Sequence, residues 1–461
     1  MKRAAFLSVA AAAAFSATAE VSFNAGADLR IRQEIFDNAT CLPGDGVAGN
    51  HGLLSAPGVK DGKYTNRLRF RPRVWGEVSF GEKLRIYSRL TDEFRWNVQP
   101  NTRSSVFPDE VFLDNLFIEG KGFFDDFLDF SAGRQDIALL YGLDHIFQDG
   151  TPGDGSRSFY ADMVRFTLNF TEVSKLDVFA LYQHDDNHLR WGTGRSDHRS
   201  LTGLGESGAE SERDEWGGGA VWSSELCEAL PYQLFVMHKG VAAYRRNGVK
   251  RPSTRRELLG MKTTPKLTDE LSLQFEAMGQ VGENGPGKTL YGWSSYAGVN
   301  WKSAAESEIR PFGSFGLHFM SGSKDTAETD GGSGAWDPMW SRAVCYSEIF
   351  SFGTHYATCW WSNLLYARLE GGFEFGRRHN LTFATGPMFA EENDGLGGGS
   401  GSYKGILHTA HYNFPLMLAD KEKGERFEMF GHLRAELFNP GDYFDSSRPA
   451  WFLRWQVEFK F

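Results

Sequence analysis

Charged and apolar residues alternate one by one in several segments of this chain. Residues 67–74 read Arg-Leu-Arg-Phe-Arg-Pro-Arg-Val. In a helix this order would spread charge around the whole surface, whereas in a strand it gives one charged face and one apolar face. The same period recurs at residues 28–32, 84–95, 366–370, 432–437 and 451–461. The pattern predicts repeated β-strands along the whole chain.

Eighteen segments are expected to be strands. They cover residues 21–36, 64–79, 83–96, 111–120, 127–139, 160–170, 175–184, 214–223, 231–243, 255–264, 270–281, 291–301, 309–320, 361–375, 380–390, 402–417, 427–438 and 450–461. Segments 111–120 and 402–417 are the weakest, so sixteen strands is the alternative count. An even number puts both ends of a barrel on the periplasmic side.

Alternation alone fits a soluble sandwich or a transmembrane barrel, in which the apolar face meets lipid. The segments are about 10–15 residues long, near the ~9–11 that cross a bilayer and above the ~5–6 usual in globular proteins. Short connections near 81–83, 172–174 and 376–378 separate long ones near 37–63, 184–213 and 320–360. The chain also ends on a strand closing with Phe461. We therefore expect an all-β fold, a transmembrane antiparallel β-barrel with short periplasmic turns and long extracellular loops.

The beginning of the chain has the layout of a secretory signal. Lys2 and Arg3 precede the apolar run 4–15, and Ala17-Thr18-Ala19 follows as a small-residue cleavage site. No later stretch approaches the ~18–20 apolar residues of a spanning helix. We expect residues 1–19 to be a Sec signal peptide and residues 20–461 a single barrel domain in the bacterial outer membrane.

Charge and cysteine content narrow the chemistry. The net charge of −10 becomes about −12 without Lys2 and Arg3, which argues against a nucleic-acid partner. The four cysteines have no zinc-site spacing, and three pairings of all four are open in an oxidising compartment. Cys345 and Cys359 are the closest pair, so we expect a loop-closing disulfide there, with Cys41 and Cys227 free. We expect no metal site and no cofactor.

If the apolar faces meet lipid, the charged faces line the lumen. The inward arginines would be Arg30, Arg32, Arg67, Arg69, Arg71, Arg73, Arg85, Arg89, Arg368, Arg434 and Arg454, tempered by acidic residues that include Glu77, Glu93 and Glu370. Guanidinium groups bind carboxylates through paired hydrogen bonds, so such a lumen would prefer anions. The alternative is that arginines and glutamates on neighbouring strands pair and stiffen the wall. Both roles can coexist.

The sequence resembles the alginate export family of outer-membrane barrels. The resemblance rests on residues 26–32 and 67–73, Gly133-Arg134-Gln135, Tyr141-Gly142, residues 149–151 and 157–162, Arg165 and the aromatic closing strand. It implies an eighteen-stranded porin whose basic lumen passes anionic polysaccharide. It also suggests Arg134 and Arg165 as further pore-facing residues.

The resemblance leaves the cargo open. The main hypothesis is a channel for an acidic polysaccharide or oligosaccharide, and the alternative is a substrate-specific uptake porin for small carboxylates or acidic oligosaccharides. An outer-membrane enzyme is the remote alternative, with His145 near Asp144 as a candidate pair, and we expect no enzyme. Expected partners are outer-membrane lipid and lipopolysaccharide, the anionic saccharide or carboxylate solute, and periplasmic export components. The long connection 320–360 would either fold inward as a constriction or cover the top.

Overall fold

The computed structural model describes residues 20–39, 42, 64–99, 107, 111–137, 140–143, 145–147, 160–183, 190–191, 214–246, 249–285, 287–324, 334–341, 346–352, 362–420, 422 and 424–461. The expected signal peptide and Cys41, Cys345 and Cys359 lie outside these residues, so the disulfide stays a prediction. Cys227 is exposed and free. In the described part of the chain, helices are too short or too polar to cross a membrane.

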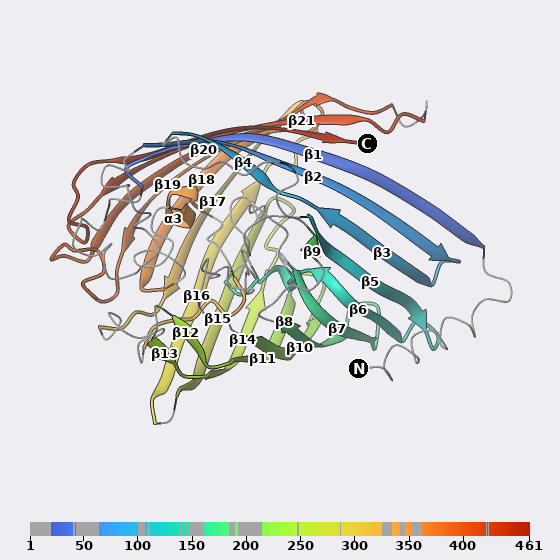
Figure 1. Ribbon diagram of the computed structural model, residues 1–461, viewed down its shortest axis with the longest axis horizontal. Coiled ribbons are helices and arrows are strands. Elements are labelled where there is room, and N and C mark those ends of the chain that lie inside the picture. Colours follow the sequence, from blue (N-terminus) through green and yellow to red (C-terminus); the bar gives the residue numbers. More distant parts are fainter. Residues whose placement is uncertain are drawn as a thin grey trace.

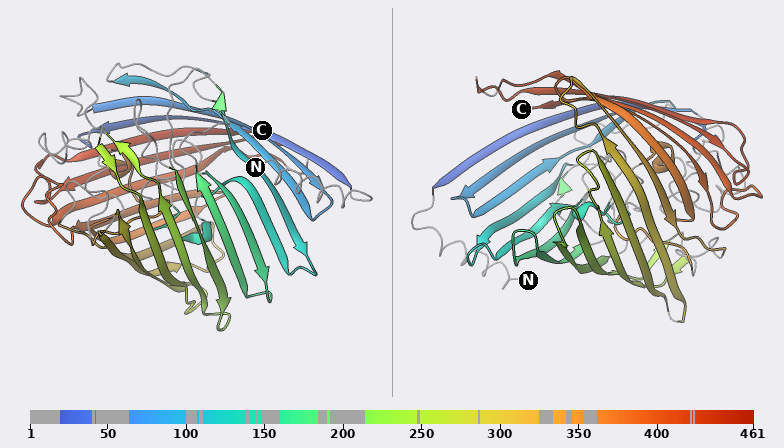
Figure 2. Two further views of the ribbon diagram at one scale, coloured as in Figure 1. Left: turned by 60° about the horizontal axis from the view of Figure 1, so that its bottom comes forward. Right: turned by 180° about the vertical axis from the view of Figure 1, so that it is seen from behind.

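The sheet closes into an antiparallel barrel of eighteen strands (Figures 1 and 2). The first half comprises β1 (Val21–Asp37), β2 (Tyr64–Phe80), β3 (Leu84–Thr91) continued by β4 (Phe94–Gln99), β5 (Val111–Phe123), β6 (Leu128–Asp136), β7 (Tyr160–Asn169), β8 (Lys175–Gln183), β10 (Glu215–Glu225) and β11 (Pro231–Val241). The second half comprises β14 (Thr254–Thr263), β15 (Leu271–Asn284), β16 (Thr289–Lys302), β17 (Ile309–Met320), β18 (Leu364–Phe375), β19 (His379–Phe389), β20 (Tyr403–Met417), β21 (Glu428–Pro440) and β22 (Ala450–Lys460). The predicted fold and strand count are confirmed.

Five short elements of the described residues lie outside the eighteen barrel strands. Strand β9 (Arg190–Trp191) pairs with the start of β5, and β12 (Tyr244–Arg246) pairs with β13 (Val249–Arg251) as a separate ribbon. Two further elements are helical: η1 (Leu140–Gly142) and α3 (Glu348–Phe352).

Strands β1 and β22 close the barrel. Their register runs from Asp28 opposite Lys460 to Asp37 opposite Trp451. Closure removes the unpaired edge that an open sheet would expose to lipid. The third strand is divided into β3 and β4 opposite Pro72 of β2, which has no N–H to donate.

Short turns join strands at one end of the barrel. Residues 81–83 join β2 to β3, and residues 376–378 join β18 to β19, as the sequence predicted. Gly81 and Gly376 adopt positive φ values of 59° and 54°, which glycine allows without steric cost. By the usual asymmetry of outer-membrane barrels, this end is periplasmic and the opposite end extracellular.

The outer surface is apolar. Alternate residues that face away from the lumen keep large exposed fractions, such as 60% for Val74, 57% for Leu369 and 47% for Leu433. A soluble protein does not expose an apolar band around its whole circumference. The barrel therefore has the exterior of an integral outer-membrane protein.

A charge placed in this band should destabilise the barrel. Leu433 lies near the middle of β21, so we expect Leu433→Arg to cost about 2–4 kcal/mol of unfolding free energy in a bilayer. The control is Leu226→Arg in the short turn after β10, which should cost less than about 1 kcal/mol. Urea unfolding in phosphatidylcholine vesicles measures both, and equal costs would contradict the assigned lipid-facing band.

Candidate functional site: an arginine ladder in the lumen

The register of the closing strands gathers inward-facing arginines from distant parts of the sequence. In one row the Cα partners are Arg434 on β21, Arg454 on β22, Glu34 on β1 and Arg67 on β2. The next rows toward the periplasmic end pair Arg32 with Arg69, Arg30 with Arg71 and Asp28 with Arg73. These eight inward arginines are termed the arginine ladder: Arg30, Arg32, Arg67, Arg69, Arg71, Arg73, Arg434 and Arg454.

Two buried glutamates bind the middle of the ladder. Glu34 accepts hydrogen bonds from Arg67 Nε and Arg69 Nη1, both at 2.8 Å, and from Arg32 Nη1 at 3.3 Å. Glu93 lies 2.8 Å from Arg69 Nη2 and 3.4 Å from Arg30 Nη2. Because burial excludes water from these charged groups, their charges are stabilised by the ion pairs that they form with one another.

The periplasmic end of the ladder continues onto β3 and β5 with more exposed groups. Arg73 binds Asp28 at 2.8 Å, Arg89 binds Asp114 at 2.8 Å, and Arg85 lies between Glu77 and Glu119 at 3.0 and 2.7 Å. The exposed fraction of the side chain rises from 2% at Arg69 to 18% at Arg73 and 37% at Arg85. Solvent-exposed ion pairs exchange partners at low cost.

An aromatic row lies beside these exposed arginines. Trp75, Tyr87 and Phe117 share the inward face of β2, β3 and β5, with ring centroids 6.1 Å apart for Trp75 and Tyr87 and 5.4 Å for Tyr87 and Phe117. The Arg85 guanidinium lies 5.6 Å from the Phe117 ring centroid. A flat ring and cationic groups therefore line the same stretch of wall.

Four of the sequence-predicted residues lie away from the ladder. Arg134 pairs with Asp162 of β7 at 2.7 Å, and its guanidinium lies 4.6 Å from the Tyr160 ring centroid. Arg368 and Glu370 pair with each other on β18, separated from β22 by three strands. Arg165 lines a separate polar hollow described below.

The long connection after β17 folds into the barrel. Trp336, Met339 and Trp340 are almost fully buried, and Asp337 binds Arg256 of β14 at 3.1 Å. Inward residues of the neighbouring strands, such as Phe179 of β8 and Phe235 of β11, are apolar and pack in the same cluster. Of the two alternatives for residues 320–360, the described residues support the inward fold. Sequence alternation had assigned all apolar residues to lipid and missed this interior core.

Helix α3 belongs to the same connection and reaches the ladder. Glu436 of β21 accepts hydrogen bonds from Ser347 Oγ at 2.7 Å and from the backbone N–H groups of Glu348 and Ile349 at 2.9 and 3.1 Å. The Glu348 carboxylate accepts a hydrogen bond from Arg454 Nη1 at 2.6 Å. Sequence reasoning missed Glu348, because its place in a long connection does not show which wall it meets.

A second inward segment, residues 140–143 and 145–147, packs against Trp340 and against strands β16 and β17. Phe147 stacks on Trp340 with ring centroids 5.2 Å apart. The His145 Nδ1 atom lies 2.7 Å from Ser294 Oγ, and its Nε2 atom lies 3.1 Å from His318 Nδ1. Burial lowers the pKa of His145 to about 3, so it is neutral at physiological pH. These contacts give His145 a positioning role for the segment.

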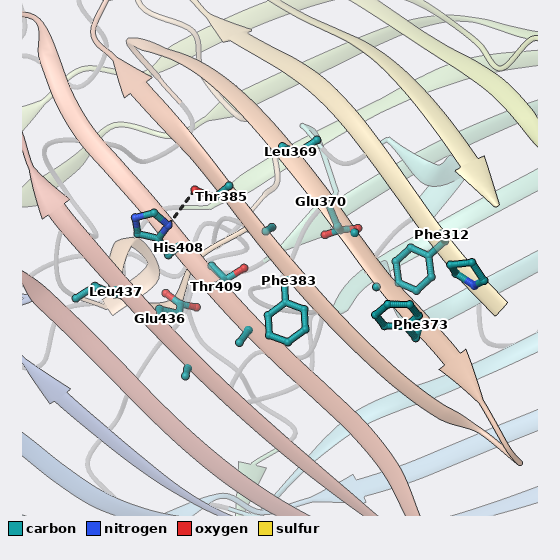
Figure 3. Close-up of a pocket in the computed structure, with 16 residues that line it drawn as sticks. Phe312, Leu369, Glu370, Phe373, Phe383, Thr385, His408, Thr409, Glu436 and Leu437 are labelled. Carbon is teal, nitrogen blue, oxygen red and sulfur yellow. Dashed lines mark hydrogen bonds between the residues drawn. The ribbon is translucent and has the colours of Figure 1, made fainter. Parts of the chain in front are cut away.

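Two hollows lie outside the ladder. A polar hollow of about 370 Å³ near the periplasmic end is lined by Arg165, Lys175, Asp177 and Tyr141. Figure 3 shows a second hollow of about 870 Å³, whose rim includes Leu369, Phe373, Phe383 and Leu437. Most of its labelled apolar side chains are outward-facing, so this second hollow belongs to the membrane-facing surface.

No protein-family model and no curated protein matches the chain, but solved structures do. OpdK of Pseudomonas aeruginosa, crystallised with vanillate, is 10% identical over 95% of this chain and 98% of OpdK, with a TM-score of 0.54. OpdQ of the same organism is 10% identical over 95% of this chain and 97% of its own, with a TM-score of 0.53. OpdL is 11% identical over 95% and 99%, with a TM-score of 0.51.

These similarities show a shared fold. The chain is an integral β-barrel of the bacterial outer-membrane type. OpdK, OpdQ and OpdL support the porin fold and do not support the narrower resemblance to alginate exporters.

The buried centre of the ladder should depend on its glutamates. We expect Glu34→Gln to lower the unfolding free energy by about 3–5 kcal/mol, because it removes the charge that three buried guanidinium groups share. The matched control is Glu77→Gln, whose partner Arg85 is 37% exposed, and its cost should stay below about 1 kcal/mol. Denaturant unfolding of the vesicle-inserted barrel compares them, and a small loss for Glu34→Gln would contradict the network.

Proposed function

We propose that this barrel is a substrate-selective uptake porin for small carboxylates. The observation that carries the proposal is the arginine ladder, which runs along one wall from Arg454 near the extracellular end to Arg73 near the periplasmic end. Guanidinium groups recognise carboxylates bidentately, and successive sites let an anion move stepwise without being trapped. The arginines at the periplasmic end are partly exposed, as a solute path requires.

The paired carboxylates of the wall favour transit over tight binding. The arginines that a solute carboxylate would reach on this wall already have acidic partners, such as Asp28 for Arg73 of the ladder and Asp114 for the neighbouring Arg89. The solute must compete with that partner. Its net binding free energy is therefore only a fraction of that for an unpaired arginine, and the solute can dissociate again. The aromatic row of Trp75, Tyr87 and Phe117 would give carboxylates with a flat ring an additional contact.

The interior packing supports a small cargo. The inward segments 334–341 and 346–352 occupy lumen space that an extended acidic polysaccharide would need, and Tyr346 and Glu348 contact Arg434 and Arg454 of the ladder. The acidic-polysaccharide hypothesis uses the same ladder but requires these segments to leave. Direction follows the solute gradient, because a passive pore has no energy source. Lipopolysaccharide and periplasmic components remain predicted partners.

Single-channel recording in a planar bilayer tests the proposal. We expect an anion-selective reversal potential in a KCl gradient and block of the current by benzoate. Arg73→Gln should raise the dissociation constant of that block about tenfold, since a charge-assisted hydrogen bond is worth ~1.5–3 kcal/mol.

The control is Arg378→Gln in the exposed turn between β18 and β19, which should leave the block unchanged. Cation selectivity, or a block that Arg73→Gln does not weaken, would contradict the proposal. Block by an acidic polysaccharide in place of benzoate would favour the larger cargo.

A further inference from the structure

One carboxylate reaches the ladder from the lumen side. The wall supplies Glu34 from β1 and Glu436 from β21, whereas Glu348 comes from helix α3 inside the barrel (Figure 1). Its Oε1 atom lies 2.6 Å from Arg454 Nη1, and the two side chains are only 4% and 1% exposed. A solute carboxylate entering the ladder from the lumen would approach Arg454 from this same side.

The backbone of α3 is held without the Glu348 side chain. Glu436 binds the N–H groups of Glu348 and Ile349, and Arg434 Nη2 donates to the Tyr346 carbonyl oxygen at 3.1 Å. Phe350 packs edge-on against Phe438 with ring centroids 4.9 Å apart. These contacts anchor the segment, so its attachment does not require the Glu348 carboxylate.

Basic side chains lie around the Glu348 carboxylate on the barrel wall. Arg454 also contacts His432 through Nε at 3.3 Å, and its row neighbours are Arg434 and Glu34. A carboxylate at this point therefore lies at the extracellular head of the whole ladder.

We propose that Arg454 forms a carboxylate-binding subsite at the head of the ladder, and that Glu348 occupies it as an intramolecular competitor that an entering carboxylate displaces. The inference rests on the proposed carboxylate transport. It makes Glu348 a specificity-determining residue: a neutral solute cannot replace its charge at Arg454, whereas a carboxylate restores the same ion pair. No covalent step is involved.

Glu348→Gln tests the subsite, because glutamine keeps the size of the side chain and removes its charge. We expect the dissociation constant for benzoate block to fall about tenfold, since a tethered group competes at an effective concentration on the order of millimolar. The open-channel current in KCl should also rise. The control is Glu392→Gln, an exposed carboxylate paired with Lys324, which should change neither quantity.

The outcomes separate this inference from the proposed function. Wild-type channels that benzoate does not block would remove the proposed function itself. If Arg73→Gln weakens the block and Glu348→Gln leaves it unchanged or weakens it, only the competitor role of Glu348 is overturned. If Glu348→Gln does not insert, Glu348→Asp, which shortens the reach by one methylene, should still tighten the block. An unchanged dissociation constant in that variant would overturn the inference.

Discussion

The structure depends on the pairing of its first and last strands. Every backbone N–H and C=O group in lipid needs a partner within the protein, so the sheet must close, and β1 meets β22 to do so. The same two strands carry Arg30, Arg32, Glu34, Arg454 and Glu458 on their inward faces. The hydrogen bonds that close the barrel therefore also assemble the charged wall, from residues at opposite ends of the chain.

The strands and the two faces of most strands could be predicted from sequence, because the period of two along a strand is local information. The eighteen expected segments match the barrel strands, including the two weakest. Which residues lie inside the lumen was harder to predict from the sequence. Alternation does not show whether the apolar face of a strand points to lipid or to an interior core. Met163 and Phe179 belong to such an interior core. For the same reason the sequence does not show that Trp75 lies beside Tyr87 on the inward face.

The acidic partners of the arginines could also be identified only from the structure. Which carboxylate meets Arg69 is decided by register across β1, β2 and β4, and which one meets Arg454 by the course of a long connection. Arg134 shows the limit of a motif: the Gly-Arg-Gln segment suggested a pore-facing residue, but it could not show that the ion-pair partner of Arg134 is Asp162 of β7. The buried ion pairs of Arg69 with Glu34 and Glu93 fit the wall-stiffening interpretation, whereas the anion path stays a proposal.

The two halves of the interior are built by different parts of the chain. Barrel strands supply the ladder, whereas the connection between β17 and β18 supplies Trp336, Trp340 and Glu348. Under the proposed function, scaffold and selectivity are then separable in evolution, because mutations in that single connection would change which solutes are admitted while the hydrogen-bonded wall is inherited unaltered. Barrels of this shape diverge to about 10% identity and still keep one architecture.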